Sequence, residues 1–75
     1  MKVIAKRFVQ MALANGATLK TIANELGMTV AQLKEQLIKK EPFTYEESVV
    51  LMAMFGAAEM VRVIDWRGVN VRAAI

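Results

Sequence analysis

One segment limits the possible folds of this chain more than any other. Residues 18–37, TLKTIANELGMTVAQLKEQL, hold a single glycine between two stretches with helical periodicity. The first stretch, about residues 19–26, follows Thr18, whose hydroxyl can cap a helix N-terminus. Gly27 then ends this helix, because glycine takes a left-handed backbone conformation at the smallest steric penalty. Thr29 opens a capping box of the form Thr-x-x-Gln and starts a second helix, so two short helices joined by a tight turn are expected.

The spacing around this turn carries more specific information. A small residue, Ala23, precedes Gly27 by four positions, where two helices would cross closely. The apolar positions that complete the pattern are Ile22, Leu26, Met28 and Leu33. This pattern resembles the helix-turn-helix of the phage repressor and Cro-like (XRE-type) DNA-binding family, and the resemblance extends over about residues 6–56. It implies a mostly α, four-helix repressor-like domain, a transcriptional regulator of a phage or mobile element that binds duplex DNA as a dimer.

The resemblance also assigns a DNA-binding surface. In that family the second helix of the motif lies in the major groove, and its early, outward residues meet base edges. The corresponding residues here are Thr29, Val30, Ala31, Lys34 and Glu35. Lys20, Lys39 and Lys40 are expected to contact the DNA backbone. Val30 and Ala31 offer only apolar contact, for instance with thymine methyl groups, so a second interpretation stays open: a protein-interaction module, such as an antirepressor, on the same scaffold.

The charge distribution agrees with a nucleic-acid partner. Residues 1–40 hold seven Lys or Arg and two Glu, a net charge of +5, whereas residues 41–75 hold three Arg and five acidic residues, a net charge of −2. A polyanion is therefore drawn to the half that contains the glycine turn. A solvated basic face without a partner is the alternative explanation of this asymmetry.

Composition indicates a single small domain that associates with itself. Hydrophobic residues make up 56% of 75 residues, more than so short a chain can bury, so a homodimer is expected.

The chain has no Cys and no His, which removes the usual nucleophiles, bases and metal ligands. We therefore expect no catalysis, no metal and no cofactor, and a cytoplasmic protein. The longest uncharged runs, residues 8–19 and residues 48–58, are far shorter than the ~20 residues of a membrane span, so no membrane partner is expected.

The rest of the first 57 residues is predicted to complete the helix-turn-helix domain. A first helix over residues 2–14 places Phe8 in the core, and Phe43 is expected to fill the core from the loop after the glycine-turn segment. Thr44 opens another Thr-x-x-Glu capping box. The helix that follows is apolar around most of its circumference, which predicts burial on more than one side.

The C-terminal segment, residues 58–75, is predicted to form the dimer contact. Its β-branched residues alternate on either side of an Arg67-Gly68 turn, which indicates a short β-hairpin. The alternative is a fifth helix over about residues 57–65 followed by a tail. Trp66 is the expected anchor, because aromatic residues concentrate in interface cores. The full set of expected interface residues is Val61, Val63, Ile64, Trp66, Val69 and Val71.

Overall fold

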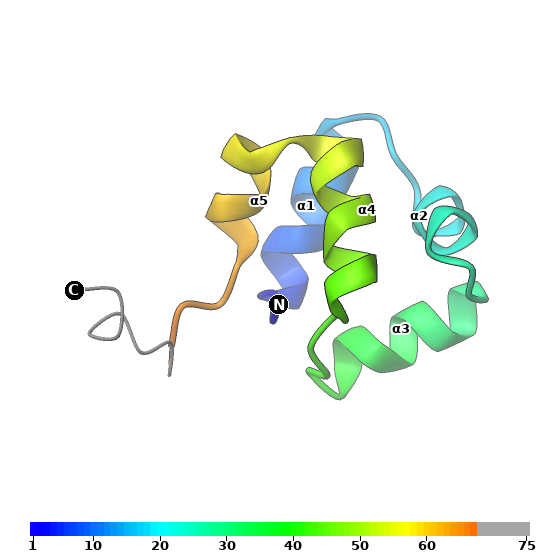
Figure 1. Cartoon of the computed structure of the whole chain (residues 1–75). Coiled ribbons are helices and arrows are strands. Elements are labelled where there is room, and N and C mark those ends of the chain that lie inside the picture. The colour runs from blue at the N-terminus through cyan, green and yellow to red at the C-terminus, as the bar shows by residue number, and fades with distance from the viewer. Residues whose placement is uncertain (68–75) are drawn as a thin grey trace.

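The computed structural model describes residues 1–67, which fold into helices joined by short turns (Figure 1). The helices are α1 (Ala5–Ala14), α2 (Leu19–Leu26), α3 (Val30–Ile38), α4 (Tyr45–Phe55) and α5 (Ala57–Val63). Figure 1 shows α4 in front of α1, with α5 to one side, α2 to the other and α3 below. The expectation of a mostly α fold is confirmed for these residues.

Three phenylalanine side chains tie the helices to the loop that precedes α4. The Phe8 side chain is fully buried, and its ring centroid lies 5.8 Å from that of Phe43 and 6.3 Å from that of Phe55. The expected core roles of Phe8 and Phe43 are therefore confirmed. The largest fully buried side chains are Phe8, Ile22, Leu33, Leu51, Met60 and Val63.

The predicted hairpin is wrong where the structure describes it. Residues 57–63 form the helix α5, so the alternative of a fifth helix is the correct one. Residues 1–67 therefore contain five helices, not four. The physical reason is burial: Met60 and Val63 are both buried, and a spacing of three puts them on the same side of a helix but on opposite faces of a strand. The second predicted strand, which includes Val69 and Val71, lies outside the described residues.

The first helix is shorter than predicted. It begins at Ala5 instead of Lys2, because the preceding residues form an antiparallel bridge between Val3 and Ile64. The backbone N–H of Ile4 donates to the carbonyl of Val63 at 2.8 Å, and that of Asp65 donates to the carbonyl of Lys2 at 2.8 Å. These backbone groups are therefore paired with the end of α5 and are not free to extend α1.

Helix α4 packs against α2 and α5, and one of its other faces is exposed to solvent. Leu51 is its one buried residue, whereas Tyr45, Val49 and Ala53, spaced four apart, are exposed. The expected burial on more than one side is thus met only partly within one copy of the chain. Among residues 1–67, every helix is too short or too polar to cross a bilayer.

Candidate nucleic-acid interface

Helix α2 begins as its sequence predicts. The backbone N–H of Thr21 donates to Thr18 Oγ1 at 3.1 Å, which satisfies one of the free amides of the first turn. Ile22 and Ala23 are buried, so one side of α2 belongs to the core. The opposite side, which carries Lys20 and Asn24, is left to solvent.

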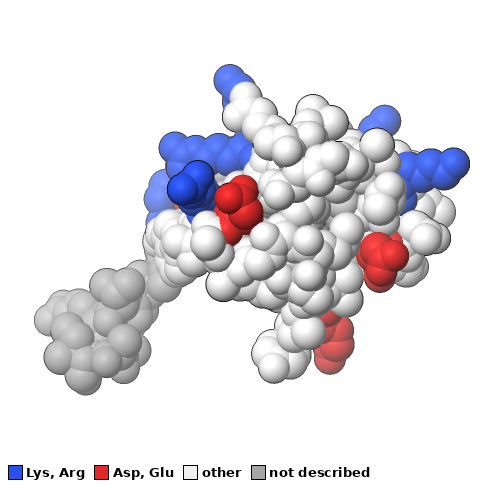
Figure 2. Space-filling model, turned by 90° about the horizontal axis from the view of Figure 1, so that it is seen from above, with Lys and Arg blue, Asp and Glu red and all other residues white. Residues whose placement is uncertain are grey.

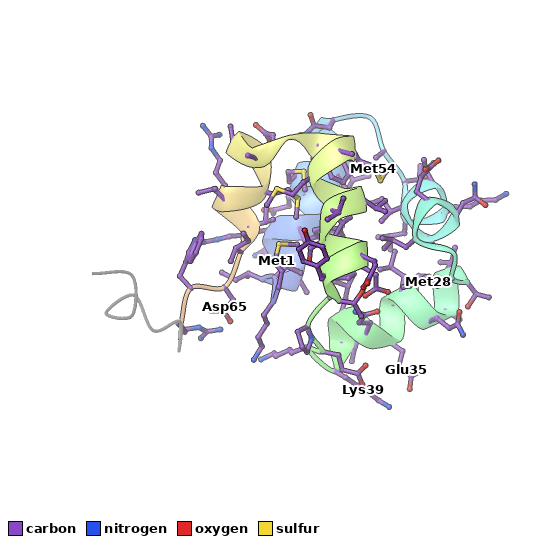
Figure 3. The ribbon with its side chains drawn as sticks, viewed as in Figure 1. Met1, Met28, Glu35, Lys39, Met54 and Asp65 are labelled. Carbon is purple, nitrogen blue, oxygen red and sulfur yellow. The ribbon has the colours of Figure 1, made fainter. Side chains whose placement is uncertain are left out.

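The turn between α2 and α3 depends on Gly27. Its φ of 72° is left-handed, as expected from the sequence. The backbone N–H of Met28 donates to the carbonyl of Ala23 at 2.9 Å, a bond that closes the C-terminus of α2. Figure 3 places Met28 at this turn, between the two helices. Because Ala23 is small and buried, α3 can start close to α2.

A capping box fixes the start of α3. The Thr29 N–H donates to Gln32 Oε1 at 2.8 Å, and the Gln32 N–H donates to Thr29 Oγ1 at 3.1 Å. The predicted capping box is confirmed, and it holds the Gln32 side chain at the helix start. Leu33 and Leu37 point into the core, so the first turn of α3 presents Ala31 and its neighbours outward.

A hollow with both polar and apolar lining lies where the exposed side of α2 meets the start of α3. It has a volume of about 490 Å³. Its polar lining comes from Lys20, Thr21, Asn24 and Thr29, and its apolar lining from Ala23, Met28 and Val30. An amine, two hydroxyls and an amide therefore lie beside three apolar side chains at one concave surface. The polar groups can bind phosphate and base edges, and the apolar ones can contact thymine methyl groups.

The structure brings only some of the eight predicted DNA-binding residues together. Three of them, Lys20, Thr29 and Val30, line the hollow, and exposed Ala31 follows directly on α3. Lys34 instead lines a different groove, between α3 and α1. The remaining three residues, Glu35, Lys39 and Lys40, lie towards the C-terminal end of α3.

Glu35 and Lys39 form an ion pair along the outer side of α3. Lys39 Nζ lies 2.7 Å from Glu35 Oε1, and more than half of each side chain is exposed (Figure 3). A pair this exposed contributes little to stability, roughly 0.3–0.5 kcal/mol. It also offsets part of the positive charge that Lys39 brings to this surface.

Lys40 follows α3 in an unusual backbone conformation. Its φ is 57°, and it is the single non-glycine residue with positive φ among residues 1–67. The Glu41 N–H donates to the Gln36 carbonyl at 3.0 Å, a bond that closes the helix end around Lys40. A position that favours glycine is thus occupied by an exposed lysine.

Two residues of the hollow, Thr21 and Asn24, were missed in the sequence. The signal that could have found Asn24 is its spacing of four from Lys20, which puts both on the outer side of α2. Asn24 supplies an amide donor and acceptor, which the side chains of Val30 and Ala31 at the start of α3 lack.

The predicted dimer residues divide into buried, exposed and undescribed positions. Val63 is 2% exposed and belongs to the core of its own chain, and Ile64 is half-buried in the bridge with Val3. Val61 is 49% exposed and Trp66 is 53% exposed. The Trp66 indole Nε1–H donates to the Val61 carbonyl at 3.1 Å, which holds the ring at the end of α5. Val69 and Val71 lie outside the described residues.

An ion pair next to Trp66 orders the chain after α5. Arg67 donates through Nε to Asp65 Oδ1 at 2.9 Å and through a terminal nitrogen to Oδ2 at 2.8 Å. The backbone N–H of Arg67 donates to the same Oδ1 at 3.0 Å. The Arg67 side chain and its backbone amide hold the pKa of the Asp65 carboxyl well below its usual range. Trp66 therefore lies between two residues that are hydrogen-bonded to each other, of which Asp65 is labelled in Figure 3.

Charge is not spread evenly over the surface. In the view of Figure 2, Lys and Arg lie around the edge, and uncharged side chains cover the middle.

Comparison of the chain with protein-family models, curated proteins and solved structures found no match. The arrangement of these residues is therefore the basis for any functional assignment.

Proposed function

We propose that the protein is a small transcriptional regulator that binds duplex DNA as a homodimer. In this proposal α2 and α3 form a repressor-type helix-turn-helix, and the first turn of α3 enters the major groove. The observation that carries the proposal is the hollow between α2 and α3, in which polar groups lie beside apolar side chains. There, Lys20, Asn24 and Thr29 meet beside an exposed helix start, while the other side of both helices is buried.

Positively charged side chains around this surface supply the phosphate contacts. Lys20 lies at the hollow, and Lys34 is exposed one turn further along α3. Lys40 supports the proposal in a second way, because a lysine occupies a position where glycine is preferred. In the proposal, Lys40 occupies this position because its positive charge contacts a DNA phosphate, although its backbone conformation is unfavourable for a lysine.

The base contacts are weaker and partly apolar. Val30 and Ala31 can touch thymine methyl groups, and the Asn24 amide can pair with an adenine edge. We propose that phosphate contacts supply most of the affinity and that these few groups supply modest sequence preference. Salt dependence should therefore be strong and discrimination between duplexes small.

The proposed dimer contact uses the exposed apolar residues at the end of α5. Val61 and Trp66 lie next to each other there, joined by the indole hydrogen bond. An aromatic ring held in place before association loses little conformational freedom on binding, which suits it as an anchor. Val63 is excluded from this contact, because its own chain already buries it.

The proposal is tested by the salt dependence of duplex binding, measured by fluorescence anisotropy. Lys20→Gln should lower the slope of log affinity against log salt by about one unit, because one phosphate contact is lost. The matched control is Arg62→Gln, which removes an exposed charge from α5, on the side of the molecule away from α2 (Figure 1). The same change in slope for both variants would contradict the proposed surface.

A further inference from the structure

An apolar groove runs between α1 and α3, beside the proposed DNA surface. It has a volume of about 410 Å³. Val9, Leu19 and Leu37 line it, one from each of the first three helices. Lys6 comes from α1 and Lys34 from α3, so each of the two helices beside the groove contributes one amine.

Ile38 makes this groove an unusual surface for a small protein. It also lines the groove, at the last position of α3, and it is 78% exposed. Single exposed apolar residues are common, but here the exposed residue continues the half-buried side chains Val9 and Leu19. Contiguous apolar surface of this kind marks an interaction site.

The charge around the groove has one sign. Helix α1 contains no carboxylate, and the first acidic residue of the chain is Glu25. The groove lining itself includes no acidic residue. Within residues 1–67, the ion pairs are those of Lys39 with Glu35 and Arg67 with Asp65, so Lys6 and Lys34 are not neutralised.

Two other occupants fit these observations poorly. A DNA backbone would contact the two lysines. It would leave the apolar side chains of the groove exposed to water, because phosphates and sugars bring little apolar surface. A second copy related by two-fold symmetry would place Lys6 and Lys34 of one copy against those of the other. Like charges facing each other across an interface disfavour that pairing.

We propose that this groove binds an acidic amphipathic helix of a partner protein. Apolar side chains of that helix, spaced three or four apart, would fill the space over Val9, Leu19 and Leu37. Its carboxylates would lie against Lys6 and Lys34. Because Lys34 also belongs to the proposed DNA surface, a bound helix would compete with duplex DNA. The groove itself does not depend on DNA binding, so the inference goes beyond the proposed function.

The test begins with a display library of randomised short peptides, selected against the full chain. The expected result is enrichment of peptides that are rich in Asp and Glu and carry apolar residues at i, i+3 or i+4, and i+7. The affinity of an enriched peptide is then measured by fluorescence anisotropy. Ile38→Ser and Lys6→Glu should each weaken it at least about tenfold.

Matched controls separate the groove from general surface effects. Leu13→Ser removes another exposed leucine-sized side chain, and Arg7→Glu reverses the neighbouring charge on α1, yet neither residue lines the groove. Both controls should leave peptide affinity within about twofold. Because Ile38 and Lys6 are exposed, all four variants should keep the wild-type melting temperature, measured by circular dichroism.

Several results would overturn the inference. They are enrichment of basic or uncharged peptides, no enrichment at all, or equal losses in the groove and control variants. Loss of self-association in Ile38→Ser, measured by sedimentation, would assign the groove to a second copy instead. Failure of DNA binding would overturn the proposed function but not this inference, since the peptide assay contains no DNA.

Discussion

Lys40 offers a prediction in which stability and DNA affinity should separate. Its φ of 57° lies in the left-handed region, where a Cβ atom is unfavourable, and the Glu41 N–H bond closes the helix end around it. Lys40→Gly removes this steric penalty and also removes a charge. Lys40→Ala removes the same charge and leaves the penalty in place.

The size of the effect follows from two opposing terms. A left-handed conformation costs an L-residue about 1–2 kcal/mol, and glycine loses about 0.5–1 kcal/mol more conformational entropy on folding. Lys40→Gly should therefore raise the free energy of unfolding by about 0.5–1 kcal/mol. For a chain of this size that corresponds to an increase in melting temperature of about 2–8 °C.

Thermal and urea denaturation of the wild type and both variants provide the measurement. Lys40→Gly should melt above the wild type, whereas Lys40→Ala should not. An equal rise in both variants would show that relief of charge repulsion, not backbone conformation, is responsible. No rise in Lys40→Gly would refute the assigned backbone conformation.

The same two variants test the proposed role of the lysine charge. In duplex binding, both should lower the salt slope by about one unit, because each removes one phosphate contact. A more stable protein that binds DNA less strongly is the expected outcome for Lys40→Gly. If Lys40→Gly binds with an unchanged slope, Lys40 is not a phosphate contact.

Three further predictions concern the core, the end of α5 and the dimer. Phe8→Ala should lower the free energy of unfolding by about 3–5 kcal/mol, because the buried ring packs against two others; a native-like urea midpoint would contradict this packing. The folded-state pKa of Asp65 is lowered, so its bonds to Arg67 stabilise the fold fully above the unfolded pKa of about 4. This contribution begins to decline below that value and is lost as pH falls through the lower folded-state pKa. Asp65→Asn should therefore destabilise the protein more near pH 7 than near pH 3 in urea titrations, and an equal loss at both would refute the linkage. Trp66→Ser should shift sedimentation toward the monomer with little change in melting temperature, whereas the exposed control Tyr45→Ser should not.

Local sequence signals located most of the helix ends correctly. Thr18, Thr29 and Thr44 each accept a bond from the backbone N–H three residues later, as their spacing predicted. Gly27 ends α2 in a left-handed backbone conformation, which its lack of a Cβ atom allows. These signals act within one turn of a helix, so they can be read without knowledge of the tertiary fold.

The errors arose where distant segments decide local structure. Residues 2–4 have the sequence of a helix start, but the bridge between Val3 and Ile64 draws them into an extended conformation. In α5, β-branched residues favoured a strand, yet burial of Met60 and Val63 on one side selects a helix. Tertiary packing outweighs local preference in both cases.

The candidate site was predictable only in part for a similar reason. A helical spacing pattern places Lys34 and Glu35 on the outside of α3, but it does not say which neighbouring helix each faces. In the structure Lys34 borders the groove shared with α1, and Glu35 pairs with Lys39. Asn24 is a candidate because the start of α3 lies beside it, and this tertiary contact cannot be predicted from the spacing within α2.

Selection from a randomised duplex pool tests the central claim most directly. The full chain is mixed with the pool at low and at near-physiological salt, retained DNA is separated by gel shift, and its sequence is determined. The proposal predicts salt-sensitive retention and enrichment of a two-fold-symmetric site, since a homodimer presents two copies of α3. Retention without enrichment would limit the function to backbone binding, and no retention at either salt would contradict DNA binding altogether.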